Sequence, residues 1–291
     1  MAIKTVNVTI NGVTTALTYN ASTGKWTGTI TAPGSTSFAK SGGYYPVTVT
    51  ATNDAGTSAT DSSYKLVVKE NVKPVITITS PTSGAYVTNS KQPIVFTVVD
   101  ESGGSGVNIS SLVVKLDGTK VTSGIVSTAI TNGYSVTYTP TSAMADGSHT
   151  ITVDCSDNDG NAASTKTTTF KVDTIPPSLN VSTPTDGLLT NNASCVVSGT
   201  TNDATSSPVT LTVNGSAVTV ASNGTWSKTI TLTEGSNTIT VIAKDVAGRT
   251  TTVTRTVTLD TSVPVISNIS ITPNPATAGA TMTITVEVTN G

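Results

Sequence analysis

Apolar and polar residues alternate along most of this chain with the two-residue period of β-strands. One phrase occurs three times, as an alternating run that ends in a turn rich in Asn, Asp and Gly: residues 47–56, 151–160 and 239–248. A threonine-rich strand and then a short break containing proline follow each copy. The spacing of about 90 to 100 residues is the size of one β-sandwich. Because no window shows sustained helical periodicity, we predict an all-β protein of tandem sandwiches.

The third copy gives the clearest order of strands. Strands A and B are predicted at 179–181 and 193–199, and strand C at 209–213 ends in Asn214-Gly215, a type I′ hairpin signal. The remaining predicted strands cover residues 217–220, 226–232, 238–243 and 251–259. The second copy follows the same order, so the pattern predicts a complete sandwich for both.

The first copy begins at strand C. Its Asn11-Gly12 turn aligns with Asn214-Gly215, and nothing before it corresponds to strand A or strand B. The C-terminal residues supply the complement, since 264–267 and 281–288 are predicted as strands A and B. We therefore predict four segments: an Ig-sized domain at 1–70 that lacks strands A and B, complete domains at 71–173 and 174–260, and a two-strand segment at 261–291.

This offset admits three interpretations. In the first, the first domain is a complete smaller sheet, and the C-terminal segment is an ordinary tail or continues into a longer protein. In the second, the tail of one copy adds its strands to the first domain of the next copy. In the third, the tail docks on a different protein. In the last two, Ile284, Val286 and Val288 are the candidate partner contacts. Tyr44 and Tyr45 form a second candidate contact patch.

The composition narrows the classes of function. Charged residues make up 11% of the chain and the net charge is −2, so Thr and Ser solvate the polar phase of the strands. Without a run of Lys or Arg, we expect no binding to nucleic acid. No stretch approaches the roughly 20 apolar residues that span a bilayer, so we expect no membrane partner. The N-terminal residues enter an alternating strand without an apolar signal region, so we expect synthesis in the cytoplasm without general secretion.

Few side chains are available for catalysis. His149 is the only histidine, which leaves almost no material for a zinc site or a Ser-His-Asp triad. Cys155 and Cys195 lie on the apolar phase of strands, as buried thiols do; an inter-domain disulfide or a reactive thiol is the alternative. Trp26 and Trp226 follow equivalent turns, which favours core packing. We predict no catalytic residues and no enzyme activity.

One turn carries a dense cluster of oxygen-bearing side chains: Asp154, Asp157, Asp159 and Asn161. Their spacing resembles that of a calcium loop, although the bidentate glutamate of an EF-hand is absent. The alternative is a structural turn, in which such side chains accept backbone hydrogen bonds. Calcium is the one cofactor that the sequence suggests. The pair Asp100-Glu101 ends a strand and enters a Gly/Ser loop, and we assign it no catalytic role.

Residues 146–153 with the turn at 157–161, and residues 234–241 with the turn at 245–248, resemble bacterial Ig-like domains. The whole chain is similar to Ig-repeat proteins of tailed bacteriophages. This resemblance implies tandem Ig-like sandwiches in an extended rod, with a non-enzymatic structural or adhesive role in the tail, adsorption apparatus or capsid decoration of a virion. Implied partners are other virion proteins, copies of itself and weakly bound host-surface glycans. The alternative is an extracellular stalk, adhesin or filament subunit of a bacterial surface.

Overall fold

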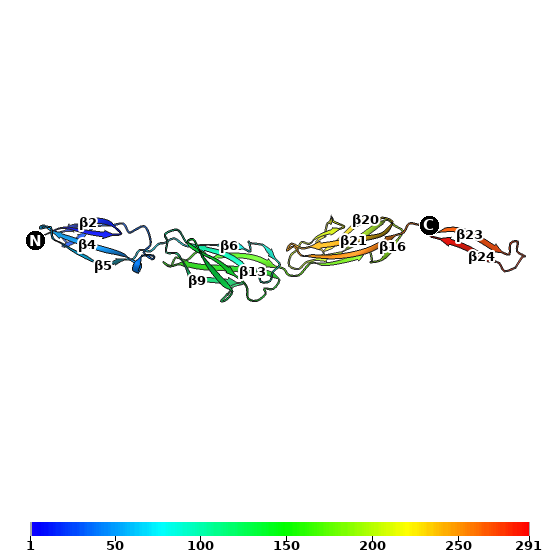
Figure 1. Cartoon of the computed structure of the whole chain (residues 1–291), viewed down its shortest axis with the longest axis horizontal. Helices are drawn as coiled ribbons and strands as arrows, with labels where there is room; N and C mark the ends of the chain where they lie inside the picture. The colour runs from blue at the N-terminus through cyan, green and yellow to red at the C-terminus, as the bar shows by residue number, and fades with distance from the viewer. Residues whose placement is uncertain (1, 291) are drawn as a thin grey trace. The chain divides into compact units, whose positions relative to one another are not determined.

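The computed structural model describes residues 2–290 and confirms the all-β prediction. Its described elements are β-strands and one short 3-10 helix, η1 (Ser41–Gly43). The chain divides into two compact units, Met1–Thr174 and Ile175–Gly291. The first unit contains the first and second repeats, and the second unit contains the third repeat and a C-terminal hairpin (Figure 1).

The first repeat is a single five-stranded sheet with the strand order β3-β2-β1-β4-β5. The Asn11-Gly12 turn joins β1 to β2, and both residues have positive φ, 49° and 78°, as a type I′ hairpin requires. The strands are β1 (Ile3–Ile10), β2 (Val13–Asn20), β3 (Lys25–Thr27), β4 (Tyr45–Asn53) and β5 (Ser58–Leu66).

This first sheet has little core. Val6, Ile10 and Tyr45 are its buried apolar side chains among residues 2–70. Hydroxyl groups instead pair across neighbouring strands on the exposed face: Thr9 with Thr14 at 2.8 Å, Thr48 with Ser62 at 3.0 Å, Thr50 with Thr60 at 3.2 Å and Thr52 with Ser58 at 2.8 Å. Such pairs each contribute a fraction of a kcal/mol, about 0.2 to 1.

The second repeat is a sandwich of two sheets, ordered β10-β9-β13-β14-β7 and β11-β12-β8-β6. Its first strands are β6 (Val75–Ser80), β7 (Tyr86–Val87), β8 (Ile94–Val99), β9 (Val107–Leu116) and β10 (Thr119–Lys120). The others are β11 (Ile125–Ile130), β12 (Gly133–Tyr138), β13 (Gly147–Asp157) and β14 (Lys166–Val172). Strict alternation on β8 and β13 sends Ile94, Phe96, Ile151 and Val153 into one core between the sheets.

The third repeat has the same two layers, ordered β15-β17-β20 and β16-β22-β21-β18-β19. Its strands are β15 (Ser178–Thr183), β16 (Leu188–Thr190), β17 (Ser194–Asn202), β18 (Thr210–Val213), β19 (Ser216–Val218), β20 (Thr225–Thr231), β21 (Gly235–Lys244) and β22 (Thr250–Leu259). Trp226 lies in its core at 4% exposure. Trp26, at the equivalent turn of the first repeat, is half-buried and packs on the ring of Tyr19.

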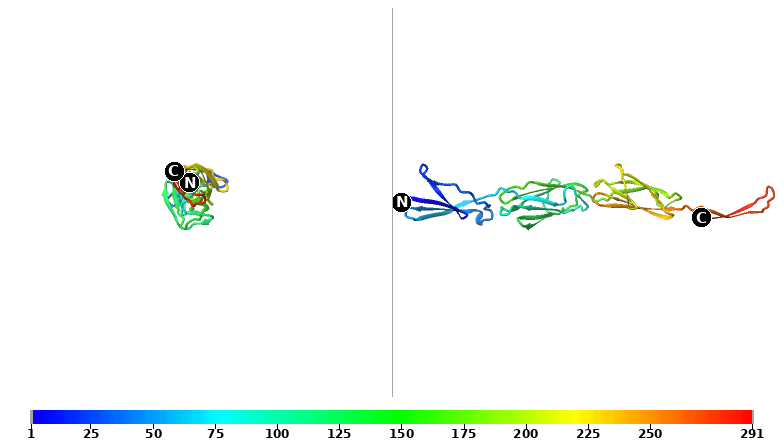
Figure 2. Two further views of the ribbon diagram at one scale, coloured as in Figure 1. Left: turned by 90° about the vertical axis from the view of Figure 1, so that its right-hand side faces the viewer. Right: turned by 90° about the horizontal axis from the view of Figure 1, so that it is seen from above.

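The C-terminal residues form a two-stranded hairpin of β23 (Val265–Thr272) and β24 (Thr283–Thr289). Every described residue of both strands is exposed. Figure 2 shows this hairpin, in red, without a second layer against either face. An isolated two-stranded hairpin has marginal stability in water, so these strands gain most from a partner sheet.

Candidate metal centre between the first two repeats

Three acidic side chains from distant parts of the sequence converge where the first repeat meets the second. One carboxylate oxygen each from Glu70, Asp100 and Asp157 lies within 4.8 Å of the others. Glu70 follows β5, Asp100 follows β8 directly and Asp157 ends β13. Both aspartates continue the inward phase of a core strand, and they are only 4% and 1% exposed. Burying a carboxylate is unfavourable unless hydrogen bonds or a counter-charge compensate it.

The backbone turn after β13 satisfies Asp157. Its Oδ1 accepts hydrogen bonds from the backbone N–H groups of Gly160 at 2.6 Å and Asn161 at 2.7 Å. Its Oδ2 accepts one from Nδ2 of Asn161, also at 2.7 Å. This arrangement is the Asx turn that the sequence predicted as the alternative to a calcium loop, and it fixes the direction of the carboxylate.

The other acids at this junction are only half satisfied. Oδ2 of Asp100 accepts the Gly106 N–H at 2.8 Å, and Oε1 of Glu70 accepts the Ser105 N–H. The second oxygen of each, Asp100 Oδ1 and Glu70 Oε2, is buried and has no hydrogen-bond partner, and Glu101 Oε2 is in the same state. A buried acceptor without a partner costs about 1 to 3 kcal/mol, and more when it is charged.

The electrostatic consequence is seen at Asp100. Burial is the largest cause that raises the pKa of this carboxyl above its ordinary value. The hydrogen bond from Gly106 works against it, and the negative charges of Glu70, Asp157 and Asp159 raise the pKa further. Several negative charges therefore lie close together at this buried position, and no cationic side chain is among the groups that shift the pKa of Asp100.

The same junction ties the two repeats together through Asp159. Its Oδ2 accepts hydrogen bonds from Thr36 Oγ1 at 2.5 Å and from the Glu70 N–H at 3.1 Å. Lys69 Nζ donates to the carbonyl oxygen of Asp159 at 3.2 Å, and Asn161 Nδ2 donates to that of Glu70 at 3.2 Å. The turn after β13 therefore holds the segment that leaves the first repeat.

The structure separates the four residues of the predicted calcium loop. Asp157, Asp159 and Asn161 all lie at the junction, but only Asp157 belongs to the group of converging carboxylates. Asp154 lies outside the converging group: its Oδ1 accepts the Thr165 hydroxyl at 2.5 Å, and its Oδ2 lies 3.9 Å from Lys115 Nζ. It lies an odd number of residues from Asp157, so strand alternation turns its side chain to the other face.

Two acids of this group, Glu70 and Asp100, are not among the ligands predicted from the sequence. A signal for Asp100 was present, because it continues the apolar phase of β8 and an acid on that phase must be buried. Glu70 has no comparable signal, since it lies in a segment between strands.

The predicted contact residues are placed differently from one another. Tyr45 is 3% exposed and donates its hydroxyl to the Ser35 carbonyl at 3.2 Å, so its ring is interior and offers no contact surface. Tyr44 is half-buried under Lys65, whose Nζ lies 4.3 Å from the ring centre. The tail residues Ile284, Val286 and Val288 are all exposed.

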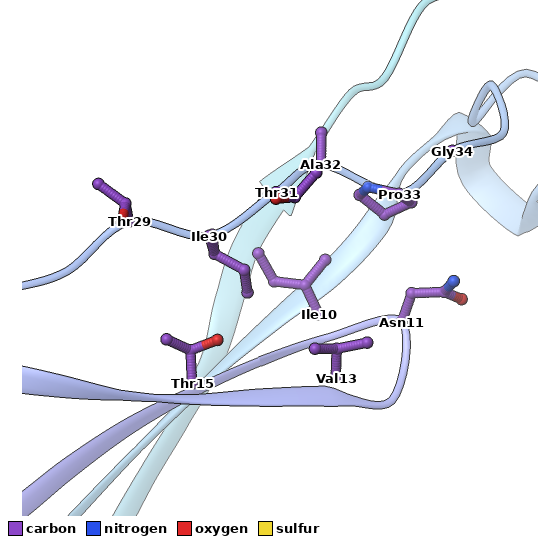
Figure 3. A pocket seen from close by; sticks show the side chains of 10 residues that line it. All are labelled: Ile10, Asn11, Val13, Thr15, Thr29, Ile30, Thr31, Ala32, Pro33 and Gly34. Atoms are coloured by element: carbon purple, nitrogen blue, oxygen red, sulfur yellow. The ribbon is translucent and has the colours of Figure 1, made fainter.

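The first repeat also carries an open groove whose lining mixes apolar and polar residues. Residues 29–34 run beside the β1–β2 hairpin without pairing as a strand, and they enclose a groove of about 510 Å³. Figure 3 shows the side chains of Ile10, Val13 and Ile30 facing this space. Ile10 is buried, whereas Val13 is 60% exposed. Part of the apolar face of this sheet therefore lacks a cover.

The fold and its repeats define the class of this protein as tandem Ig-like β-sandwiches. Residues 74–153 match the family described as bacterial Ig domain, and residues 177–261 match the family described as glucodextranase, domain B. The first match covers the second repeat only as far as β13, and the second match covers the third repeat. Ig-like domains of this kind are typically non-catalytic. No helix among residues 2–290 has the length and apolar character needed to cross a bilayer.

Three similar proteins extend this comparison. Chitinase ChiA of Flavobacterium johnsoniae is 34% identical over an alignment of 169 residues, and the match covers 53% of this chain and 10% of that chitinase. Fibronectin(III)-like modules of Clostridium thermocellum CbhA share 19% identity at a TM-score of 0.39, over 64% of this chain and 94% of theirs. Titin domains I67–I69 share 14% sequence identity at a TM-score of 0.42, and the match covers 89% of this chain and 88% of the titin chain. These two structural likenesses are too weak to support a functional argument.

Proposed function

We propose that this chain is a non-enzymatic, load-bearing structural module, in which Ig-like repeats hold other parts of an assembly apart. The observation that carries the proposal is how the second and third repeats are closed. In each, a short strand near the beginning pairs in parallel with the last strand: β7 with β14, and β16 with β22. The entering and leaving segments of the chain are thus hydrogen-bonded directly to each other.

This pairing determines how tension acts. When the two ends of a repeat are pulled apart, parallel first and last strands are drawn in opposite directions along their axes. Their evenly spaced hydrogen bonds are then strained together rather than broken one after another. In the second repeat, Lys171 N–H donates to Ala85 O at 2.8 Å, and Asp173 N–H donates to Val87 O at 2.9 Å. In the third, Asp260 N–H donates to Thr190 O at 2.9 Å.

Single-molecule stretching of the full chain tests this proposal. Asp260→Pro removes the N–H that donates to the Thr190 carbonyl oxygen of the edge strand β16, and Asp260 is exposed, so no core contact is lost. Ala217→Pro is the matched control, because it is exposed on β19, the opposite edge strand of the same sheet. We expect Asp260→Pro alone to lower the unfolding force of one repeat, because it breaks a hydrogen bond between β16 and the end of β22. Equal forces for the two variants would overturn the load-bearing role.

Two settings are proposed for such a module. The resemblance to phage Ig-repeat proteins favours a virion, as part of the tail, the adsorption apparatus or the capsid decoration. The matches to a bacterial Ig domain and to part of a bacterial chitinase favour a bacterial surface or a carbohydrate-associated module. Immunogold labelling distinguishes them: labelled phage particles support the virion setting, and labelled intact bacteria support the surface setting. Retention on chitin beads tests the carbohydrate association.

Self-assembly by strand exchange is a second candidate function, favoured by one difference between repeats. In the third repeat, β20 pairs along its length with β17, its strand B. In the first repeat, β3 pairs only with β2 among the described residues, and its continuation borders the open groove. β24 corresponds to β17 and pairs only with β23 in the described chain. We propose that β24 of one copy pairs beside β3 of another and covers the groove.

A pair of substitutions on β24 tests strand exchange. Ile284→Lys places a charge on the phase shared with Val286 and Val288, whereas Thr285→Lys places it on the opposite phase. Sedimentation of the full chain should show oligomers that Ile284→Lys, or removal of residues 261–291, abolishes and Thr285→Lys preserves. A monomer at all concentrations, or oligomers that survive the removal, would rule out this mode of assembly.

A further inference from the structure

We propose that Glu70, Asp100 and Asp157 bind one divalent cation, calcium by preference, and that this ion links the first repeat to the second. The proposal is independent of the load-bearing role, because it concerns a different part of the fold and stands or falls on ion binding. Its ligand set differs from the predicted calcium loop: two of the three acids come from outside that loop.

The first argument is the unused oxygen. Asp100 is only 4% exposed, yet its Oδ1 accepts no hydrogen bond. Glu70 Oε2 is likewise buried and unpartnered. Native structures rarely leave such acceptors empty, and an ion is one of the standard reasons when they do. Here two of them belong to carboxylates that already converge within 4.8 Å.

The second argument is the chemistry of the ligands. All three converging groups are carboxylates, and hard cations such as Ca²⁺ prefer oxygen, whereas zinc sites are built from histidine and cysteine. Calcium accepts six to eight oxygens in irregular geometry, which suits ligands from two strand ends and a connecting segment. Magnesium demands a near-ideal octahedron and keeps several waters, so it fits this arrangement less well.

A fourth carboxylate is within reach. Glu101 Oε2 is buried and unpartnered, like Glu70 Oε2. Gly104 makes room for both acids: a Cβ there would lie 2.7 Å from Glu101 Oε1 and 2.8 Å from Glu70 Oε2. Because any larger residue would push these carboxylates apart, glycine at this position preserves the oxygen-lined space.

The location gives the ion its consequence. Glu70 lies on the segment that connects β5 to β6, while Asp100 directly follows β8 and Asp157 ends β13 in the second repeat. An ion shared by all three would join that segment to the end of the second sandwich and neutralise the crowded negative charge. The hydrogen bonds of Asp159 to Thr36 and Glu70 already hold this geometry, so few groups need to move for binding.

The test compares the full chain with two variants of equal charge. Asp100→Asn keeps the shape of the ligand but removes its charge, and Asp154→Asn removes the same charge nearby from a residue outside the group. Calorimetric titration of the chelator-treated protein with CaCl₂, with MgCl₂ as a second arm, gives affinity and stoichiometry. Asp203 and Asp245 occupy the equivalent strand ends in the third repeat, and an ion bound there would add to the measured stoichiometry. The test therefore compares the number of calcium ions bound before and after the Asp100 substitution.

We expect Asp100→Asn to lose one calcium ion or at least tenfold in affinity, and Asp154→Asn to bind like the wild type. Calcium at 100 times its wild-type dissociation constant should raise the folded-to-unfolded ratio of one repeat about 100-fold in the wild type and in Asp154→Asn, and about tenfold or less in Asp100→Asn. Glu70→Gln provides a second test if Asp100→Asn does not fold. Absence of binding at millimolar calcium, or equal binding by Asp100→Asn and wild type, would overturn the proposal.

Discussion

We predict that protonation of His149 stabilises the second repeat. This residue on β13 is 9% exposed, and both ring nitrogens face acceptors: Nδ1 lies 2.7 Å from Asp117 Oδ2, and Nε2 lies 2.8 Å from the Ala145 carbonyl oxygen. A carboxylate and a carbonyl can only accept, so both contacts are hydrogen bonds only when the imidazole carries two protons. Burial, the largest contribution, lowers the pKa of His149, but the two acceptors together raise it above 6.5.

The sign of the pH dependence follows from this raised pKa. The stabilisation by His149 is fully present below about pH 6.5, the pKa in the unfolded chain, and is lost as the pH rises through the folded-state pKa. A hydrogen bond to a charged group contributes about 1.5 to 3 kcal/mol. Because the Asp117 side chain is 47% exposed, solvent screens the pair, and we expect about 1.5 kcal/mol.

The substitution Asp117→Asn isolates this contribution. Asn214 occupies the equivalent turn with φ 47°, close to the 49° of Asp117, and its Oδ1 accepts the Thr240 N–H as Asp117 Oδ1 accepts the Thr150 N–H. The backbone role is therefore kept, and only the charge is lost.

The assay uses the fact that His149 is the only histidine in the sequence, so its NMR titration requires no assignment. We expect the pKa to exceed 6.5 in the wild type and to fall in Asp117→Asn. Urea unfolding should show the variant less stable at pH 6, with the difference shrinking by pH 9. A wild-type pKa at or below 6.5, or no response to Asp117→Asn, would refute the reasoning.

Two further predictions follow from burial. Trp226→Ala should lower the free energy of unfolding of the third repeat by about 3 to 5 kcal/mol, whereas Trp26→Ala, at a half-buried position, should cost the first repeat clearly less; urea titrations of both variants measure this. Burial raises the pKa of the Cys155 and Cys195 thiols, so a thiol reagent at pH 7.5 should label them only at the rate of unfolding, and rapid labelling of the folded chain would contradict that.

The parts of the fold that the sequence predicts are those with local causes. The Asn11-Gly12 and Asn214-Gly215 turns specify their hairpins because those residues tolerate positive φ. Period-two alternation identifies the core strands, since each inward side chain is buried by its own strand's register. The position of Trp226 in the core follows from the same alternation.

The parts that the sequence does not predict depend on long-range pairing. β7 and β16 have two and three residues, too few for any period to appear, and their partners lie about 70 to 85 residues away along the chain. The acidic group likewise joins Glu70, Asp100 and Asp157, whose proximity depends on how the first repeat meets the second. Local spacing instead favoured Asp154, which strand alternation turns away.

The paired hydroxyl groups on the first sheet have a consequence for the response to ionic strength. Thr50 with Thr60 and Thr52 with Ser58 solvate that face without charge. Dissolved salt weakens interactions between exposed charges by screening them, and it has nothing to screen between neutral hydroxyls. The surface of this sheet should therefore behave alike in dilute and in concentrated salt. A marked dependence of this chain on ionic strength would have to originate at its charged groups, among them the acids between the first two repeats.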